Sequence, residues 1–230
     1  MTSIFAHRGH HVNHPENSLA AVQAARDFGA EGVEIDVWLS ADECLVINHD
    51  RTLNGRALPT TTFAELTSHT QLAQLHEVLD HSGTMTVNVE IKSTRSPGYN
   101  LRVARAVSEF LDSSAATSRC LVSSFSLAIC QEVRRLSPHR RVGWLVERRS
   151  ARVVLDEAAR SDLTSAHFAF SRVNASVVQG AQQLGVEVHV WTPNRRGDLE
   201  RMFDLGVDAV ITDDVVLAQE LRQARRGTTD

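Results

Sequence analysis

Short runs of β-branched and apolar residues recur along the chain, separated by longer segments in which apolar residues repeat with helical spacing. This alternation is typical of βα units around a parallel sheet, whose strands are buried on both faces. We predict eight strands, at residues 4–6, 33–37, 87–91, 120–124, 142–146, 166–170, 186–191 and 207–212. The predicted helices lie near residues 18–28, 71–81, 100–112, 125–136, 151–160, 174–184, 196–205 and 214–225.

A repeated pattern of helix, glycine and strand supports a barrel. Gly29, Gly185 and Gly206 each follow a predicted helix and precede a predicted strand. Glycine at such a position can adopt the left-handed conformation that ends a helix. Eight strands with eight helices predict an α/β fold of the (β/α)8 TIM-barrel type, and 230 residues fit one such barrel. We therefore expect a single domain over residues 1–230.

One segment departs from this alternation. The second strand is followed by a short polar stretch and by another apolar run at residues 45–48, which predicts a β-hairpin extension. A turn centred on Asp42 and Glu43 would pair residues whose numbers sum to about 85. This register would place His49 opposite Asp36.

Composition narrows the range of functions. The chain is 42% hydrophobic, and its 24 basic and 28 acidic side chains give a formal net charge of −4, as in many globular proteins. The arginines are scattered, so we expect no nucleic-acid partner, and no segment suggests membrane insertion. The N-terminal residues lack the features of a secretory signal, which predicts a cytoplasmic protein. The oligomeric state stays open.

Carboxylates gather at the ends of two predicted strands. Glu34 and Asp36 are two residues apart on one strand, so their side chains project from the same face. Glu90 and Lys92 repeat this arrangement on the next long strand. Carboxylates forced together repel, and a hard divalent cation between them relieves the repulsion. The C-terminal rim of a barrel, where these strands end, is the usual place of an active site.

Two histidines and an arginine are predicted to reach the same rim. His7 ends the first strand, Arg8 follows it, and His49 comes from the hairpin. Imidazoles can donate and accept protons near neutral pH, and the cationic side chains can hold an oxyanion. Such a set suits the cleavage of an anionic phosphodiester. A single histidine at a strand end is more often structural, and Glu34 alone could pair with an arginine, so the hypothesis depends on the convergence of these residues.

The other histidines are not expected to take part in catalysis, and Trp191 has two possible roles. His10, His11 and His14 lack the spacing of a zinc site and are expected on the exposed surface. Trp191 ends the seventh strand and is predicted either to fill the barrel core or to form a wall against the substrate. The remaining histidines singled out as structural are His139, His167 and His189.

The motifs that carry these residues together resemble the glycerophosphodiester phosphodiesterase family. The resemblance covers nearly the whole chain and rests on His7-Arg8-Gly9, Pro15-Glu16-Asn17-Ser18, Glu34-Ile35-Asp36, His49-Asp50, Glu90-Ile91-Lys92, Val190-Trp191-Thr192 and Ile211-Thr212-Asp213. It implies a TIM-barrel enzyme that hydrolyses glycerophosphodiesters to glycerol 3-phosphate and an alcohol. It also implies one divalent cation, Mg²⁺ or Ca²⁺, and a small-molecule phosphodiester as substrate.

The resemblance also assigns roles and leaves alternatives. The metal ligands would be Glu34, Asp36 and Glu90, the general acid and base would be His7 and His49, and the phosphate would lie against Arg8 and Lys92. Residues 50–75 form a shorter insertion than is usual in the family, which predicts a short lid. The alternatives are a phospholipase D-like enzyme that forms a cyclic phosphate, and a barrel that binds phosphate esters without turnover.

Overall fold

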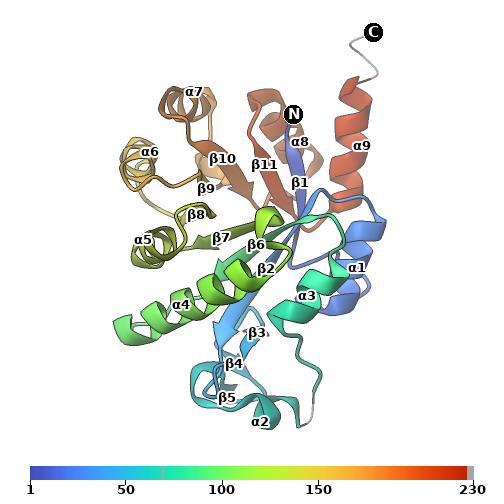
Figure 1. Cartoon of the computed structure of the whole chain (residues 1–230). Helices are drawn as coiled ribbons and strands as arrows, with labels where there is room; N and C mark the ends of the chain where they lie inside the picture. Colours follow the sequence, from blue (N-terminus) through green and yellow to red (C-terminus); the bar gives the residue numbers. More distant parts are fainter. Residues whose placement is uncertain (69, 227–230) are drawn as a thin grey trace.

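The computed structural model describes residues 1–68 and 70–226, which form a closed ring of parallel strands surrounded by helices (Figure 1). The ring contains β1 (Ser3–His7), β2 (Gly32–Leu39), β6 (Thr86–Ile91), β7 (Cys120–Ser124), β8 (Arg141–Val146), β9 (Ser165–Ala169), β10 (Glu187–Trp191) and β11 (Ala209–Thr212). Each strand pairs in parallel with the next, and β11 pairs with β1 to close the ring. The predicted TIM barrel is confirmed.

Helices follow the barrel strands and cover the outside of the ring (Figure 1). They are α1 (Leu19–Asp27), α3 (Leu75–His81), α4 (Pro97–Ser113), α5 (Leu127–Leu136), α6 (Ala151–Arg160), α7 (Ala175–Leu184), α8 (Arg196–Leu205) and α9 (Val215–Arg226). Gly185 and Gly206 end α7 and α8 with φ angles of 68° and 67°, which confirms the predicted pattern. Among the described residues, every helix is too short or too polar to cross a bilayer.

The hairpin forms, but its predicted register is wrong by one residue. Strand β3 (Leu45–Ile47) lies antiparallel to β2, and Val37 pairs with Ile47, so paired numbers sum to 84. The turn has three residues instead of two, because Glu43 adopts a left-handed φ of 63° and its N–H donates to Ser40 at 3.1 Å. The backbone carbonyl of Asp36 therefore accepts a hydrogen bond from the backbone N–H of Asn48 at 3.0 Å, and Asp36 does not lie opposite His49.

The segment between β3 and α3 contains more structure than expected. It includes β4 (Thr52–Leu53), β5 (Arg56–Ala57), a 3₁₀ turn at Leu58–Thr60 and the short helix α2 (Phe63–Thr67), all extending away from the ring in Figure 1. The helix predicted near 71–81 begins at Leu75, because Ala73 is still held beside the sheet by an N–H bond from Ile47 at 2.9 Å. Further 3₁₀ turns lie at Thr117–Arg119 and Phe170–Arg172.

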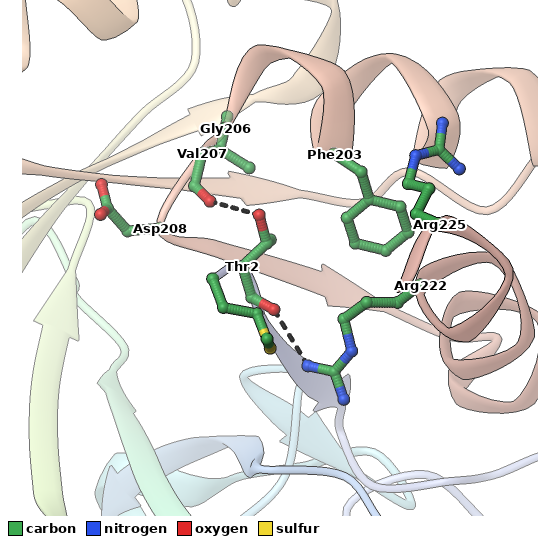
Figure 2. A pocket seen from close by; sticks show the side chains of 8 residues that line it. Thr2, Phe203, Gly206, Val207, Asp208, Arg222 and Arg225 are labelled. Atoms are coloured by element: carbon green, nitrogen blue, oxygen red, sulfur yellow. Dashed lines mark hydrogen bonds between the residues drawn. The ribbon is translucent and has the colours of Figure 1, made fainter. Parts of the chain in front are cut away.

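The N-terminal end of the barrel is tied to the last helix (Figure 2). Thr2 donates its hydroxyl to the carbonyl of Val207 at 2.7 Å, and Arg222 of α9 donates to the carbonyl of Thr2 at 3.0 Å. A hollow of about 300 Å³ lies beside these residues. Arg222 is also paired with Glu31, which directly precedes β2, so α9 is held against the starts of both β1 and β2.

The barrel interior holds polar side chains at positions that usually carry branched aliphatic residues. Asn88, Ser123, His167 and His189 are all buried there, and the two imidazole rings stack with centroids 4.5 Å apart. Gly143 leaves the space that His167 occupies, since a Cβ built on Gly143 would lie 2.3 Å from the Nε2 atom of His167. The small residue on β8 and the large one on β9 are therefore complementary.

Gly143→Ala is expected to lower the free energy of unfolding by about 1–3 kcal/mol, because the added methyl group overpacks a buried site. Urea denaturation measures the change. Gly98→Ala is the matched control, since a Cβ on Gly98 meets nothing within 4 Å in α4. Equal stability of the two variants would show that the interior can absorb a methyl group beside His167.

Acid is expected to destabilise the protein through His167. Burial, and then the charges of His189 and Arg141, hold the pKa of His167 well below its ordinary value, so the folded protein keeps this imidazole neutral. The unfolded chain takes up a proton there below about pH 6.5. Since the unfolded state binds more protons, the free energy of unfolding falls as the pH falls, by about 1.4 kcal/mol per pH unit from this residue.

This pH effect is measured by urea denaturation at a series of pH values between about 7 and 5. His167→Gln removes the titrating group and is expected to flatten the loss of stability over that interval. His139→Gln is the control, because the side chain of His139 is 65% exposed. An identical pH slope for wild type and His167→Gln would contradict the prediction.

Candidate active site

A pocket of about 190 Å³ opens at the C-terminal end of the barrel strands. All eight side chains that the sequence singled out line it, namely His7, Arg8, Glu34, Asp36, His49, Glu90, Lys92 and Trp191. Phe125, Leu145, Thr192 and Ile211 complete the lining. The convergence predicted from the strand ends is therefore present in the fold, although several larger hollows lie elsewhere on the surface.

The three carboxylates form a compact group at the base of the pocket. Glu34, Asp36 and Glu90 are only 3%, 1% and 7% exposed, and one oxygen of each lies within 4.8 Å of the others. Register explains this, because Asp36 on β2 is paired with Glu90 on β6. Burial, followed by repulsion from Asp36 and Glu90, raises the pKa of Glu34 well above its usual range.

This group fits a hard divalent cation. Oxygen atoms are its donors, which is the ligand type that Mg²⁺ and Ca²⁺ prefer. The Oε1 atom of Glu34 is buried and has no hydrogen-bond partner within the described part of the chain. Burial also raises the pKa of Glu90, with repulsion from Asp36 adding to it. A cation would satisfy the unpaired oxygen and remove the repulsion.

Lys92 lies across two of the carboxylates. Its Nζ donates to Asp36 at 2.9 Å and to Glu90 at 2.8 Å. Burial lowers the pKa of Lys92, but attraction to Glu90 and Asp36 outweighs it, so the pKa lies above its usual value. The side chain is 16% exposed and carries a fixed positive charge at the edge of the pocket.

Arg8 is held in place by neighbouring acids. Its guanidinium donates to Glu16 at 3.0 Å, and its Nε atom lies 3.5 Å from Asp36. The backbone of Arg8 has a left-handed φ of 55°, and its N–H donates to Glu34 at 3.1 Å. Both the side chain and the main chain of this residue therefore contact the carboxylate group.

Asn17 is a positioning residue that the sequence interpretation missed. Its side chain donates to Asp36 at 2.8 Å and accepts from the backbone N–H of Asp36 at 3.2 Å. Ser18 is the residue that caps α1, by accepting from the N–H of Ala21 at 3.2 Å. The sequence carries one signal for this role. Asn17 directly precedes Ser18, and Ser18 alone is enough to cap the helix, so the polar side chain of Asn17 is free for another contact.

His7 is oriented by an acid that directly follows the last barrel strand, β11. Its Nδ1 donates to the carboxylate of Asp213 at 2.7 Å, which leaves Nε2, 4.0 Å from Glu34, on the side of the pocket. Burial raises the pKa of Asp213, but hydrogen bonds from His7, His11 and Asn194 outweigh it and hold the pKa below its ordinary value. The sequence interpretation quoted Asp213 in a motif but gave it no role.

His49 has a carboxylate partner of its own. Its Nδ1 lies 2.9 Å from Asp50, and its side chain is 37% exposed at the rim. Because an ionised carboxylate can only accept, the proton lies on Nδ1 and Nε2 keeps its lone pair. Both imidazoles of the pocket therefore favour the same tautomer.

Trp191 fits both predicted interpretations. Its ring packs against the small apolar cluster of Phe5, Ala209 and Ile211, and its indole N–H donates to the carbonyl of His167 at 3.2 Å. The same ring lines the pocket and meets Phe125 edge-on, with centroids 5.6 Å apart. The side chain of Trp191 therefore packs against the barrel core and also forms an aromatic wall of the pocket.

The expectation that three early histidines lie exposed on the surface is wrong for two of them. His10 is 6% exposed and packs against Phe28, with ring centroids 4.5 Å apart. His11 is half-buried and donates to Asp213 at 3.2 Å. His14 is exposed as expected. The loop folds back over the barrel rim because Asn17 and Arg8 are joined by a backbone bond of 2.9 Å, which no local pattern reveals.

Comparison with known proteins agrees with this geometry. Residues 7–217 match the model of the glycerophosphoryl diester phosphodiesterase family. The chain belongs to this family. A glycerophosphodiester phosphodiesterase from Caldanaerobacter subterraneus subsp. tengcongensis is 32% identical over 93% of this chain and 94% of its own length. The resemblance stated from the motifs is therefore confirmed.

Solved structures of the glycerophosphodiester phosphodiesterase family share the barrel. The crystal structure of a member from Parabacteroides distasonis has a TM-score of 0.88 and 26% identity, covering 100% of this chain and 98% of its own. A member from Thermotoga maritima has a TM-score of 0.81 and 27% identity, covering 96% of this chain and 99% of its own. In both cases the structural similarity extends over the whole barrel.

Proposed function

We propose that this protein is a phosphoric diester hydrolase that converts glycerophosphodiesters to glycerol 3-phosphate and an alcohol. One observation carries the proposal: a single pocket collects three buried carboxylates, two cationic side chains and two imidazoles that each have a carboxylate partner. The family match and a relative named for this activity support the choice of substrate. A site that only binds phosphate esters would have no use for two oriented imidazoles.

One divalent cation, Mg²⁺ or Ca²⁺, would be held by Glu34, Asp36 and Glu90, whose geometry fits it. When bound, it would supply a Lewis acid that polarises the phosphoryl group of the substrate. Lys92 and Arg8 lie at the edge of the same carboxylate group, where their charges can hold the remaining phosphate oxygen. These residues prepare the phosphorus for attack by neutralising the negative charge around it.

Proton transfer falls to His7 and His49. The Nε2 atom of one imidazole takes the proton of the attacking oxygen, which is a water or the substrate's own 2-hydroxyl. The protonated Nε2 of the other gives its proton to the alkoxide that leaves as the phosphorus–oxygen bond breaks. Asp213 and Asp50 accept from the two Nδ1 atoms and so keep each Nε2 available. The aromatic wall of Trp191 and Phe125 borders the reacting groups.

The test is a panel of glycerophosphodiesters incubated with Mg²⁺, Ca²⁺, Mn²⁺ or chelator, with release of glycerol 3-phosphate as the readout. We expect release to be at least about 10²-fold slower in chelator than with the preferred divalent cation. Absence of release from every member of the panel would refute the proposed activity. Phosphorus NMR of the product decides whether the 2-hydroxyl or water attacks first, because a cyclic phosphate accumulates only in the former case.

A further inference from the structure

A second cluster of metal-ligating side chains stands beside the proposed catalytic site. His7, His11 and Asp213 each place one donor atom within 4.8 Å of the other two, in a group separate from the three carboxylates. Asp213 Oδ1 lies 2.7 Å from Nδ1 of His7 and 3.2 Å from Nε2 of His11. The three side chains are 21%, 26% and 36% exposed, so a small ion can reach them from solvent.

The donors of this cluster differ in chemistry from those of the carboxylate group. Two imidazole nitrogens and one carboxylate oxygen suit a borderline ion such as Zn²⁺, whereas Mg²⁺ and Ca²⁺ prefer oxygen donors alone. Three protein ligands with a fourth position open to water is a common zinc arrangement. Asn194 donates to the second oxygen of Asp213, which is the type of outer contact that orients a metal-binding carboxylate.

Within the described part of the chain, Asp213 forms ion pairs with these two imidazoles. No arginine or lysine of that part is paired with it, so an entering ion has no fixed cation to displace. Neutral imidazoles can shift their proton to the other ring nitrogen and offer the lone pair to a metal. Binding at this place therefore needs only a change of tautomer and small side-chain movements.

We propose that His7, His11 and Asp213 form a second metal site, which binds a transition-metal ion such as Zn²⁺. The bound ion inhibits the enzyme because it coordinates His7. An ion on Nδ1 leaves the proton on Nε2, so the nitrogen that faces the pocket loses its lone pair. The inhibition, though not the binding, rests on the role proposed above for His7.

Calorimetric titration with ZnCl₂ tests the binding, using the full chain with saturating Mg²⁺. Wild type is expected to bind Zn²⁺, and His11→Gln to bind it at least about tenfold more weakly through the loss of one ligand. His14→Gln is the matched control, because His14 lies on the same loop but is exposed and outside the cluster. It is expected to bind Zn²⁺ as wild type does.

A third variant shows which cluster takes the ion. Glu90→Gln alters the carboxylate group and is expected to keep the zinc affinity of wild type. Equal zinc affinity for wild type and His11→Gln would overturn the proposal, as would loss of binding in Glu90→Gln. Because calorimetry needs no turnover, this result stands even if the proposed hydrolysis fails.

Inhibition is tested by release of glycerol 3-phosphate at saturating Mg²⁺ with increasing Zn²⁺. Wild type and His14→Gln are expected to lose activity as the zinc site fills. His11→Gln, measured against its own zinc-free rate, is expected to need at least about tenfold more Zn²⁺ for the same fractional inhibition. Zinc bound to wild type with no loss of rate would overturn the inhibitory role.

Discussion

His7→Ala and His49→Ala are each expected to lower kcat by about 10²- to 10⁴-fold, because each removes a positioned group that transfers a proton. Both imidazoles line the pocket and have a carboxylate partner on Nδ1, so each presents Nε2 as the reactive nitrogen. The measurement is the initial rate of glycerol 3-phosphate release at saturating substrate and divalent cation. The proposal predicts a fall in kcat larger than any change in KM.

The matched controls are histidines outside the pocket. His14→Ala and His139→Ala remove exposed imidazoles and are expected to leave the rate unchanged. Near wild-type rates for His7→Ala and His49→Ala, with Mg²⁺ or Ca²⁺ added, would disprove acid–base catalysis by these residues. The pH dependence of kcat in each surviving variant then assigns the two roles, since loss of the base removes the rise of the rate with pH.

Removal of divalent cations is expected to lower the rate by about 10²- to 10³-fold, since a metal at a phosphoryl oxygen stabilises the transition state by several kcal/mol. The structural reason is the buried group of Glu34, Asp36 and Glu90, in which the Oε1 atom of Glu34 has no hydrogen-bond partner among the described residues. The measurement compares the rate after treatment with chelator and after addition of excess Mg²⁺ or Ca²⁺. Full recovery is expected with the preferred ion.

A carboxylate variant separates a metal effect from an effect of the chelator. Glu34→Gln keeps the shape of the side chain but removes its charge, so more cation is expected to be needed for half-maximal rate. Glu109→Gln changes an exposed carboxylate on α4 and is the control. Undiminished turnover in chelator, together with an unchanged cation requirement in Glu34→Gln, would exclude a metal at this group.

The sequence contains enough information for the barrel and for most of the pocket lining. Strand and helix periods are local properties, and the closure of eight parallel strands brings every strand end to one rim. Residues at those ends, such as Glu34 and Glu90, were therefore predicted together. The three-residue turn at Glu43 was missed because a left-handed residue other than glycine leaves little trace in sequence.

By itself the sequence determined the fold class, the family and eight of the twelve residues that line the pocket. Only the tertiary structure decided that Asn17 holds Asp36, that Asp213 orients His7, and that His11 joins them. These contacts join residues 19, 206 and 202 positions apart, and each involves at least one side chain from a loop. Periodicity reports which face a residue occupies, whereas the path of a loop depends on long-range packing that no local pattern records.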